Sequence, residues 1–391
     1  MVDHLAITSV KPAKLISAVF ILATPFSMAQ VKSPDKNTPT MSDRELRGLR
    51  GPVKSCTETS TYSAVTDADG SAHQYHSEYT TEYDTAGRIV VTRSRNSDGS
   101  YWITRSDYDS TGRLLKTASG VEGGTFTETS YSYDQQGRLQ NITAGDKPDS
   151  PAVFRYDEQG RKSKIEVSTP ADYRSNVAFG GSPFEAADRA PNLPDGGSAT
   201  TLYDDHDRAT EVQVRDASGE LVSRVLRTYD AHGRVIEEKQ ILEDPTAMIP
   251  SEARTQLLEQ SGFSADQLRQ ELLAQFTKFM AGRSLYSVSH NYDTHGRVNH
   301  STRRIFNREE EIETTYSEHG DTESEITRST PLGEETDPTA AAPGPLAYSE
   351  VRYAYRYDQH ENWIGQESSY RSSPDGALQP TTVTKRVLTY Y

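Results

Sequence analysis

The hexapeptide Tyr-Asp-x-x-Gly-Arg recurs along this chain and constrains its fold more than any other feature. Six copies are complete, and three altered copies follow the same frame at 203–208, 316–321 and 357–362. An aspartate at the start of a turn accepts hydrogen bonds from backbone amides just ahead of it, and glycine takes a position that often needs positive φ. The hexapeptide therefore predicts a tight turn between two antiparallel strands.

The complete copies supply the candidate binding residues, for which we expect a structural role in the repeated turns. They are Tyr83, Asp84, Gly87, Arg88, Tyr108, Asp109, Gly112, Arg113, Tyr133, Asp134, Gly137, Arg138, Tyr156, Asp157, Gly160, Arg161, Tyr229, Asp230, Gly233, Arg234, Tyr292, Asp293, Gly296 and Arg297.

The spacing of the hexapeptides predicts the organisation of the sheet. Successive motif tyrosines are separated by 25, 25, 23, 47, 26, 63, 24 and 41 residues, so the basic unit has about 24–26 residues, with three expansions. A second turn halfway along each compact unit, such as Asn96 to Gly99, predicts two strands of about eight residues per unit. We therefore expect an all-β domain over 51–391, in which repeated antiparallel β-hairpins form a curved or spiral sheet.

Three insertions lengthen the units, and all of them fall where the second turn belongs. They are a Pro, Gly and Ala-rich loop at 169–198, a helical hairpin at 243–282 and an acidic, Pro and Ala-rich loop at 330–347. Loops on a scaffold often carry function, which makes this elaborated edge a candidate site, but insertions also collect where they do least harm. In the helical hairpin, Leu268, Leu272, Phe276 and Phe279 share one face, which predicts either packing onto the sheet or docking of a partner.

The recurring core from Tyr131 to Leu139 and the closing stretch 356–363 resemble the RHS or YD-repeat family of bacterial surface and secreted proteins. The resemblance extends from about Val53 to the C-terminus, and the closing stretch is similar to that of small stand-alone members. In large members of this family the repeats coil into a β-shell that encloses a toxin. The resemblance also suggests carbohydrate binding. The DPxGL sequence that marks the self-cleaving end of the shells does not occur here.

The N-terminal residues predict the compartment. Lys11 and Lys14 precede an apolar run from Leu15 to Phe26, and small residues precede Gln30, which is typical of a secretory signal peptide at 1–29. We expect residues 30–50 to be a linker. The protein is then secreted, periplasmic or located at the cell surface, with no membrane span in the mature chain.

Composition excludes several classes of partner and of fold. The chain has 42 basic and 57 acidic residues, a net charge of −15, which argues against nucleic acid and anionic membranes as partners. Cys56 is the only cysteine, so an intramolecular disulfide is excluded, and we expect this residue to be buried on the first strand. Apolar residues make up 34%, too few for one large core.

Histidines and tyrosines each leave two interpretations open. His206, His232, His295, His319 and His360 occupy the same turn position, where they form either a row of metal ligands or ordinary polar turn residues. We predict no metal and no cofactor, because nothing fixes converging ligands. Tyrosines at 131 and 133, and at 353, 355 and 357, recur with the period of a strand, which suits either stacking on sugars or packing between strands.

The sequence favours a non-catalytic function. It contains no HExxH, GxSxG, phosphate-loop or GxGxxG motif, so we predict that the protein is not an enzyme. A secreted hydrolase that uses acids within 310–337 is the catalytic alternative. The predicted function is an exported repeat scaffold that binds surface polysaccharide or a protein partner. The alternative is a remnant or accessory component of an RHS-type toxin-delivery shell. The ends of an open sheet would also permit edge-to-edge homodimerisation.

Overall fold

The computed structural model describes residues 41–63, 65–66, 72–145, 147–168, 197–244, 251–279, 284–306, 308–332 and 347–391. The predicted signal peptide and most of the loops at 169–198 and 330–347 lie outside these residues. The helices are α2 (Asp43–Leu46), α3 (Ser251–Ser261) and α4 (Ala265–Phe279). Two short strands, β2 (Val65–Thr66) and β3 (Ala72–His73), pair only with each other.

The main sheet contains twenty strands. They are β1 (Val53–Tyr62), β4 (His76–Tyr83), β5 (Ile89–Arg95), β6 (Tyr101–Tyr108), β7 (Leu114–Val121), β8 (Phe126–Tyr133), β9 (Leu139–Ala144), β10 (Lys147–Tyr156), β11 (Lys162–Ser168), β12 (Ser198–Tyr203), β13 (Ala209–Arg215), β14 (Leu221–Tyr229), β15 (Val235–Leu242), β16 (Ser284–Tyr292), β17 (Val298–Phe306), β18 (Arg308–Tyr316), β19 (Thr322–Pro331), β20 (Ala347–Tyr357), β21 (Trp363–Arg371) and β22 (Gln379–Tyr390).

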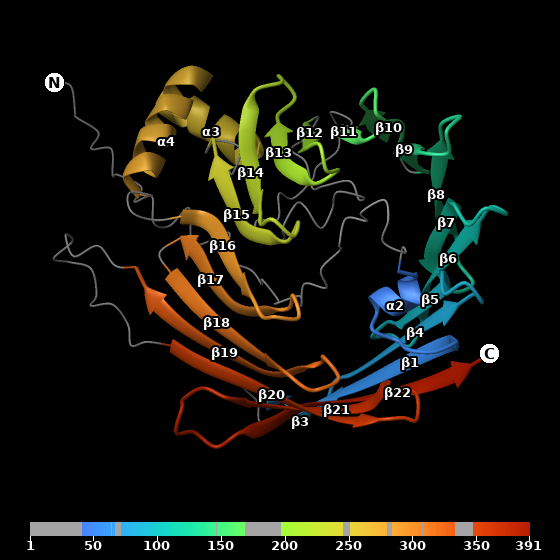
Figure 1. The fold of residues 1–391 in the computed structure, drawn as a ribbon. Coiled ribbons are helices and arrows are strands. Elements are labelled where there is room, and N and C mark those ends of the chain that lie inside the picture. Colours follow the sequence, from blue (N-terminus) through green and yellow to red (C-terminus); the bar gives the residue numbers. More distant parts are fainter. Residues whose placement is uncertain are drawn as a thin grey trace, which may run out of the picture.

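The sheet closes into an antiparallel barrel. From β4 to β22 each strand pairs with its neighbours in the chain, and β1 pairs with β22 on one side and with β4 on the other. Figure 1 shows the result as a ring in which β22, in red, runs beside β1, in blue. The expected curved or spiral sheet is therefore wrong. The twist between neighbouring strands accumulates around the sheet, and here it brings the last strand back to the first.

Closure also removes the free edges on which edge-to-edge dimerisation depends. Each of the twenty described strands of the main sheet has a hydrogen-bonded neighbour on both sides. An open sheet would present unpaired N–H and C=O groups at both ends. The arrangement therefore gives no support to a homodimer formed by edge pairing.

The two faces of the barrel wall can be told apart. Figure 1 shows α2 inside the ring, and Arg47, next to α2, donates a hydrogen bond to the Thr81 hydroxyl at 3.2 Å. The face of β4 that carries Thr81 is thus the inner face. Side chains alternate between faces along a strand, and on β22 they change from buried Thr384 to exposed Lys385 and Val387. Register then carries this assignment around the ring, so that the motif tyrosines lie on the inner face.

Burial is concentrated in two separate clusters rather than in one core. One contains Phe154, Ala199, Ala209, Val212 and Val225, from β10 to β14. The other contains Leu49, Val53, Cys56 and Tyr83, where β1 meets β4. Cys56 is buried as predicted, and burial raises the pKa of its thiol to about 11, which makes it a poor nucleophile.

The helical hairpin lies at the edge opposite the hexapeptide turns. It follows β15, and Leu268 of α4 is only 6% exposed. Arg269 faces the buried carboxylate of Asp244 at 3.5 Å and Glu220 at 3.6 Å, which ties α4 to the ends of β13 to β15. Within the described residues, no helix is both long enough and apolar enough to cross a lipid bilayer.

Candidate binding site

The aspartate of each complete hexapeptide fixes its own turn. In the first copy, one oxygen of the Asp84 carboxylate accepts the backbone N–H of Arg88 at 2.9 Å, and the other accepts its side-chain Nε at 2.6 Å. Burial alone would raise the pKa of Asp84, but the hydrogen bonds from Arg88 outweigh it and lower the pKa. The same two bonds occur at Asp109, Asp134, Asp157, Asp230 and Asp293.

Arginine and tyrosine link each turn to the next. The Arg88 guanidinium lies 4.7 Å from the centre of the Tyr108 ring, and the Tyr108 hydroxyl donates to the carbonyl of Ile89 at 2.9 Å. This stacking recurs at 4.4–4.9 Å in Arg113–Tyr133, Arg138–Tyr156, Arg208–Tyr229, Arg234–Tyr292 and Arg297–Tyr316. Cation–π contacts and hydrogen bonds thus connect these pairs of successive turns along one rim. We call these contacts the turn ladder.

Both the backbone conformation and the space available favour glycine at this position of the hexapeptide. Gly112 has φ +90°, and a Cβ added there would lie 2.7 Å from Nη1 of Arg88 in the preceding turn. In the altered copy at 203–208, Asp207 adopts the left-handed region instead, with φ 59°. Its carboxylate accepts the backbone N–H of Lys162 at 2.5 Å, an additional contact with the neighbouring turn.

The segment expected to be a linker begins the turn ladder. Ser42 caps α2, and the backbone N–H of Arg44 donates to the carbonyl of Gly87 at 3.0 Å. The Asp43 carboxylate accepts the backbone N–H of Ile89 at 2.8 Å. Since no hexapeptide precedes the first turn, α2 occupies the place of a preceding turn.

An aromatic row lies on the inner face near the end of the chain. Tyr353, Tyr355 and Tyr357 follow one another on β20, with ring centres 6.4 and 6.0 Å apart. Trp363 of β21 lies 6.1 Å from Tyr355. We call these four residues the aromatic row. The Arg386 guanidinium covers the Trp363 ring at 3.3 Å, so that ring is already stacked within the wall.

Polar side chains hold the aromatic row in place. The Tyr355 hydroxyl donates to the carbonyl of Thr322 at 2.8 Å and accepts from Nε2 of Gln366 at 3.1 Å. Burial raises the pKa of Tyr355 to about 12, so its hydroxyl stays protonated at neutral pH. Glu325, on the inner face of β19, has a pKa raised by burial, although the Arg303 charge acts against this.

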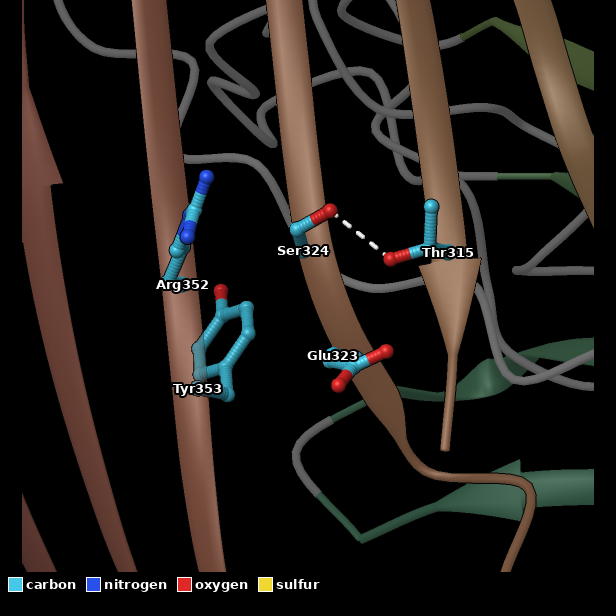
Figure 2. Close-up of a pocket in the computed structure, with 5 residues that line it drawn as sticks. All are labelled: Thr315, Glu323, Ser324, Arg352 and Tyr353. Carbon is cyan, nitrogen blue, oxygen red and sulfur yellow. Dashed lines mark hydrogen bonds between the residues drawn. The ribbon is translucent and has the colours of Figure 1, made fainter. Parts of the chain in front are cut away.

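A polar pocket of about 300 Å³ adjoins one end of the aromatic row. It is lined by Thr315 of β18, Glu323 and Ser324 of β19, and Arg352 and Tyr353 of β20. Figure 2 shows these residues on three adjacent strands, with the Thr315 and Ser324 hydroxyls hydrogen-bonded to each other at 2.8 Å. We call it the β18–β20 pocket.

Two local features shape the β18–β20 pocket. The pairing of β18 with β19 shifts between Thr315 and Tyr316, which leaves Glu323 in a bulge, and bulges redirect side chains. The Arg352 Nε donates to the Glu350 carboxylate at 2.5 Å. Burial raises the pKa of Glu350, but hydrogen bonds from Tyr348, Arg352 and Arg371 outweigh it and lower the pKa to about 2. The charged carboxylate therefore orients Arg352.

The sequence predicted only part of this site. The period of two placed Tyr353, Tyr355 and Tyr357 on one face, and the structure confirms it. The role of Glu323 was missed, because its bulge depends on the register of two strands. The pocket lies on the strands themselves rather than on the elaborated edge.

The turn histidines do not converge on a shared site. Among the described residues, one group of possible metal ligands comes together, formed by Asp204, Asp205 and His206, whose ligand atoms lie within 4.8 Å of one another. Asp204 is already bonded to Arg208, and the side chains of Asp205 and His206 are 69% and 67% exposed. Such a group gives little support to a metal centre.

Comparisons with known proteins identify no family. No protein-family description and no curated protein matches the chain. A porin-like protein from Bacteroides uniformis is 10% identical, with 87% of this chain and 99% of that chain covered and a TM-score of 0.32. A TcdB2-TccC3-Cdc42 structure is 13% identical, with 84% and 16% covered and a TM-score of 0.36.

A further solved structure, the Photorhabdus luminescens Tc holotoxin pore, is also 13% identical. It covers 80% of this chain and 20% of its own, with a TM-score of 0.16. The solved structures similar to this chain thus include Tc toxin components, while the YD-repeat resemblance itself has no family match. With TM-scores this low, none of these likenesses supports a function.

Proposed function

We propose that this chain is a non-catalytic, exported barrel that binds polysaccharide through the β18–β20 pocket and the adjoining aromatic row. The observation that carries the proposal is that the Tyr353 ring and the exposed Glu323 carboxylate line an opening of about 300 Å³ beside the aromatic row. Thr315, Ser324 and Arg352, which lie opposite one another across β18 to β20, project from the other face of the wall. An aromatic ring offers an apolar face to a sugar ring, and the carboxylate matches sugar hydroxyls.

The size and exposure of the pocket favour a short segment of a chain-like ligand. Its volume is near the lower end for ligand pockets, which suits one or two sugar units. Glu323 is exposed, so a polymer can pass over the site without entering a closed cavity. Tyr353 belongs both to the pocket and to the aromatic row, so a polymer bound at the pocket would extend along β20.

The outer wall supports an aqueous location for the barrel. Ion pairs stand on its outer face at Lys116–Glu128, Arg155–Glu166, Arg304–Glu309 and Arg328–Glu313. A charged side chain on the lipid-facing side of a membrane barrel costs about 2–4 kcal/mol at the bilayer midplane. These ion pairs support the proposal that the exported protein works in the periplasm, at the cell surface or outside the cell.

Two of the acids proposed for a hydrolase are paired with arginines in the barrel wall. Glu310 pairs with Arg303 at 2.5 Å, and Glu313 pairs with Arg328 at 2.9 Å. A glycosidase needs one carboxyl group as an acid and a second as a base or nucleophile at a defined distance. Paired carboxylates in the wall favour a structural role, which agrees with a binding function.

The proposal is tested by measuring the binding of residues 30–391 to a panel of bacterial and plant polysaccharides. Tyr353→Ala and Glu323→Ala should each weaken binding about tenfold, because each removes one face of the pocket. Tyr131→Ala is the matched control, since Tyr131 is an inner-face tyrosine on β8, far from the pocket in the strand order. Saturable binding that the control retains supports the proposal, and no binding to any polysaccharide overturns it.

A protein partner is the second candidate, favoured by the helical hairpin. Phe263 and Leu273 are 43% and 38% exposed at the elaborated edge. Replacing 242–283 by a short turn should abolish binding to such a partner while leaving polysaccharide binding at the β18–β20 pocket unchanged. This variant separates the two functions.

A further inference from the structure

Two carboxylates on the inner face of β19 have no basic partner. Glu323 and Glu325 are two residues apart on this strand, so they project from the same face. Within the described part of the chain, neither carboxylate forms an ion pair with a lysine or an arginine. Glu323 is exposed and lines the opening beside Tyr353, and Glu325 is half-buried.

The arginines that flank this part of the inner face are paired with other acids. Arg303 of β17 lies 2.5 Å from the Glu310 carboxylate. Arg386 of β22, which covers the Trp363 ring, lies 2.9 Å from a carboxylate of β1. Burial raises the pKa of Glu325 and outweighs the charge of Arg303, which acts in the opposite direction. A partly buried carboxylate without a close cation is costly, so β19 carries negative charge that the wall does not compensate.

Tyrosine rings lie on both sides of these carboxylates. Figure 2 shows Glu323 of β19 beside Tyr353 of β20. Burial raises the pKa values of Tyr353 and of Tyr316 on β18, and the charge of Glu325 adds to the rise in both. Glu325 is therefore close enough to act on a ring of each neighbouring strand. The two acids and the rings form one surface on the inner face of β18 to β20.

An ammonium group matches both components of this surface. A carboxylate accepts its N–H groups in charge-assisted hydrogen bonds, and the face of a tyrosine ring attracts a cation. A neutral hydroxyl would form weaker hydrogen bonds, and an anionic sugar would meet two like charges. The net charge of −15 also favours the approach of a cation. The surface therefore selects its ligand by charge.

The aromatic row favours a polymer of sugars over a basic peptide. The ring centres of Tyr353, Tyr355 and Tyr357 follow one another at 6.4 and 6.0 Å. Successive rings suit successive sugar units, each of which has an apolar face. A lysine side chain offers only a narrow aliphatic stem. An amino sugar carries its ammonium on the ring that stacks, so one unit can contact both Tyr353 and a carboxylate.

We propose, building on the function proposed above, that the polysaccharide bound at this site is a cationic polymer of amino sugars. Its ammonium groups pair with Glu323 and Glu325, while its sugar rings lie on Tyr353 and Tyr355. Neutral and acidic polysaccharides of the same length then bind more weakly.

The test compares a fully deacetylated chitosan hexamer with its fully N-acetylated counterpart, which has the same backbone and no ammonium groups. Isothermal titration of full-length protein at about pH 6 lies between the ordinary pKa values of carboxyl and amino groups. The chitosan hexamer should bind about tenfold more tightly, because charged hydrogen bonds replace neutral ones. Glu323→Gln with Glu325→Gln should abolish this preference and leave binding of the acetylated hexamer nearly unchanged.

A matched variant separates this site from general attraction of a polycation to an acidic protein. Glu311→Gln with Glu367→Gln removes two exposed acids from the outer face of the same wall, on β18 and β21. The net charge changes equally, but the preference for chitosan should remain. Tyr353→Ala should weaken the binding of both hexamers, because both stack on its ring.

The amino-sugar specificity is overturned if the two hexamers bind equally, if the acetylated one binds more tightly, or if the outer-face variant also loses the preference. Hexalysine that binds more tightly than chitosan through the same two carboxylates overturns it as well, in favour of a basic peptide. Binding of any other polysaccharide that Tyr353→Ala weakens, without a preference for chitosan, removes the specificity alone and leaves the proposed function in place. If no polysaccharide binds, both fail.

Discussion

The side chain of Asn362 forms two hydrogen bonds with the backbone of Arg50, 312 residues earlier in the chain. Its Oδ1 accepts the Arg50 N–H at 2.7 Å, and its Nδ2 donates to the Arg50 carbonyl at 2.9 Å. Asn362 is 1% exposed, although it occupies the arginine position of a hexapeptide. An altered repeat therefore forms a contact that closes the barrel.

Replacing this amide should weaken closure. Asn362→Ala removes both bonds and leaves a buried N–H and C=O unpaired, so we expect a loss of about 2–4 kcal/mol in the free energy of unfolding. Denaturant unfolding measures the change. Asn299→Ala, at an exposed position of β17, is the control and should change stability by less than about 0.5 kcal/mol. Equal losses in both variants would contradict a special role for Asn362.

Two glycines with similar backbone angles separate strain from crowding. Gly112 and Gly123 have φ +90° and +79°, but only at Gly112 would a Cβ meet a neighbour, Nη1 of Arg88 at 2.7 Å. Gly123→Ala should cost about 1 kcal/mol, the strain of an alanine in this region. Gly112→Ala should cost more, because it also displaces Arg88 from Tyr108. Thermal unfolding of the two variants gives the comparison. Equal losses of stability would show that the contact of Arg88 with Tyr108 adds nothing to the cost.

The hydroxyl groups of the turn ladder should make small, separable contributions. Tyr133→Phe removes the hydrogen bond to the Leu114 carbonyl at 2.8 Å but keeps the ring under Arg113. We expect a loss of about 1 kcal/mol in unfolding free energy. Tyr133→Ala also removes the stacking and should cost about 3 kcal/mol or more. A phenylalanine variant as unstable as the alanine variant would show that the hydroxyl, not the ring, dominates.

Acid stability should depend on Glu350. Its pKa is lowered from 4.5 to about 2, so its stabilising contribution is complete above the unfolded value and disappears as pH falls toward 2. Glu350→Gln should be less stable at neutral pH and should show a flatter decline of stability in acid. Exposed Glu367 of β21 provides the control, Glu367→Gln. An unchanged acid profile in Glu350→Gln would show that other carboxylates determine it.

The sequence predicts the local turns well, because the residues that form each turn all lie within one hexapeptide. Asp84 and Gly87 form the expected turn, with Gly87 at φ +84°. It does not predict closure, which depends on the pairing of β1 with β22 and on twist summed over the whole sheet. For the same reason, the sequence alone suggests that Asn362, at the arginine position, belongs to a degraded repeat. Its role becomes clear only from its hydrogen bonds with the Arg50 backbone. The bulge at Glu323 depends on strand register, and so does its place in the pocket.

Closure of the barrel is tested most directly by a disulfide between β1 and β22. Ser55 and Thr389 are paired residues of β1 and β22, with hydroxyl oxygens 2.6 Å apart. In a Cys56→Ala background, Ser55→Cys with Thr389→Cys should form an intramolecular disulfide on mild oxidation. Ser60→Cys with Ser77→Cys, paired residues of β1 and β4, controls for the reactivity of thiols on β1. The closed barrel predicts crosslinking within one chain for both pairs. It would be contradicted if the Ser55–Thr389 pair stayed reduced or linked separate chains while the control pair formed its disulfide.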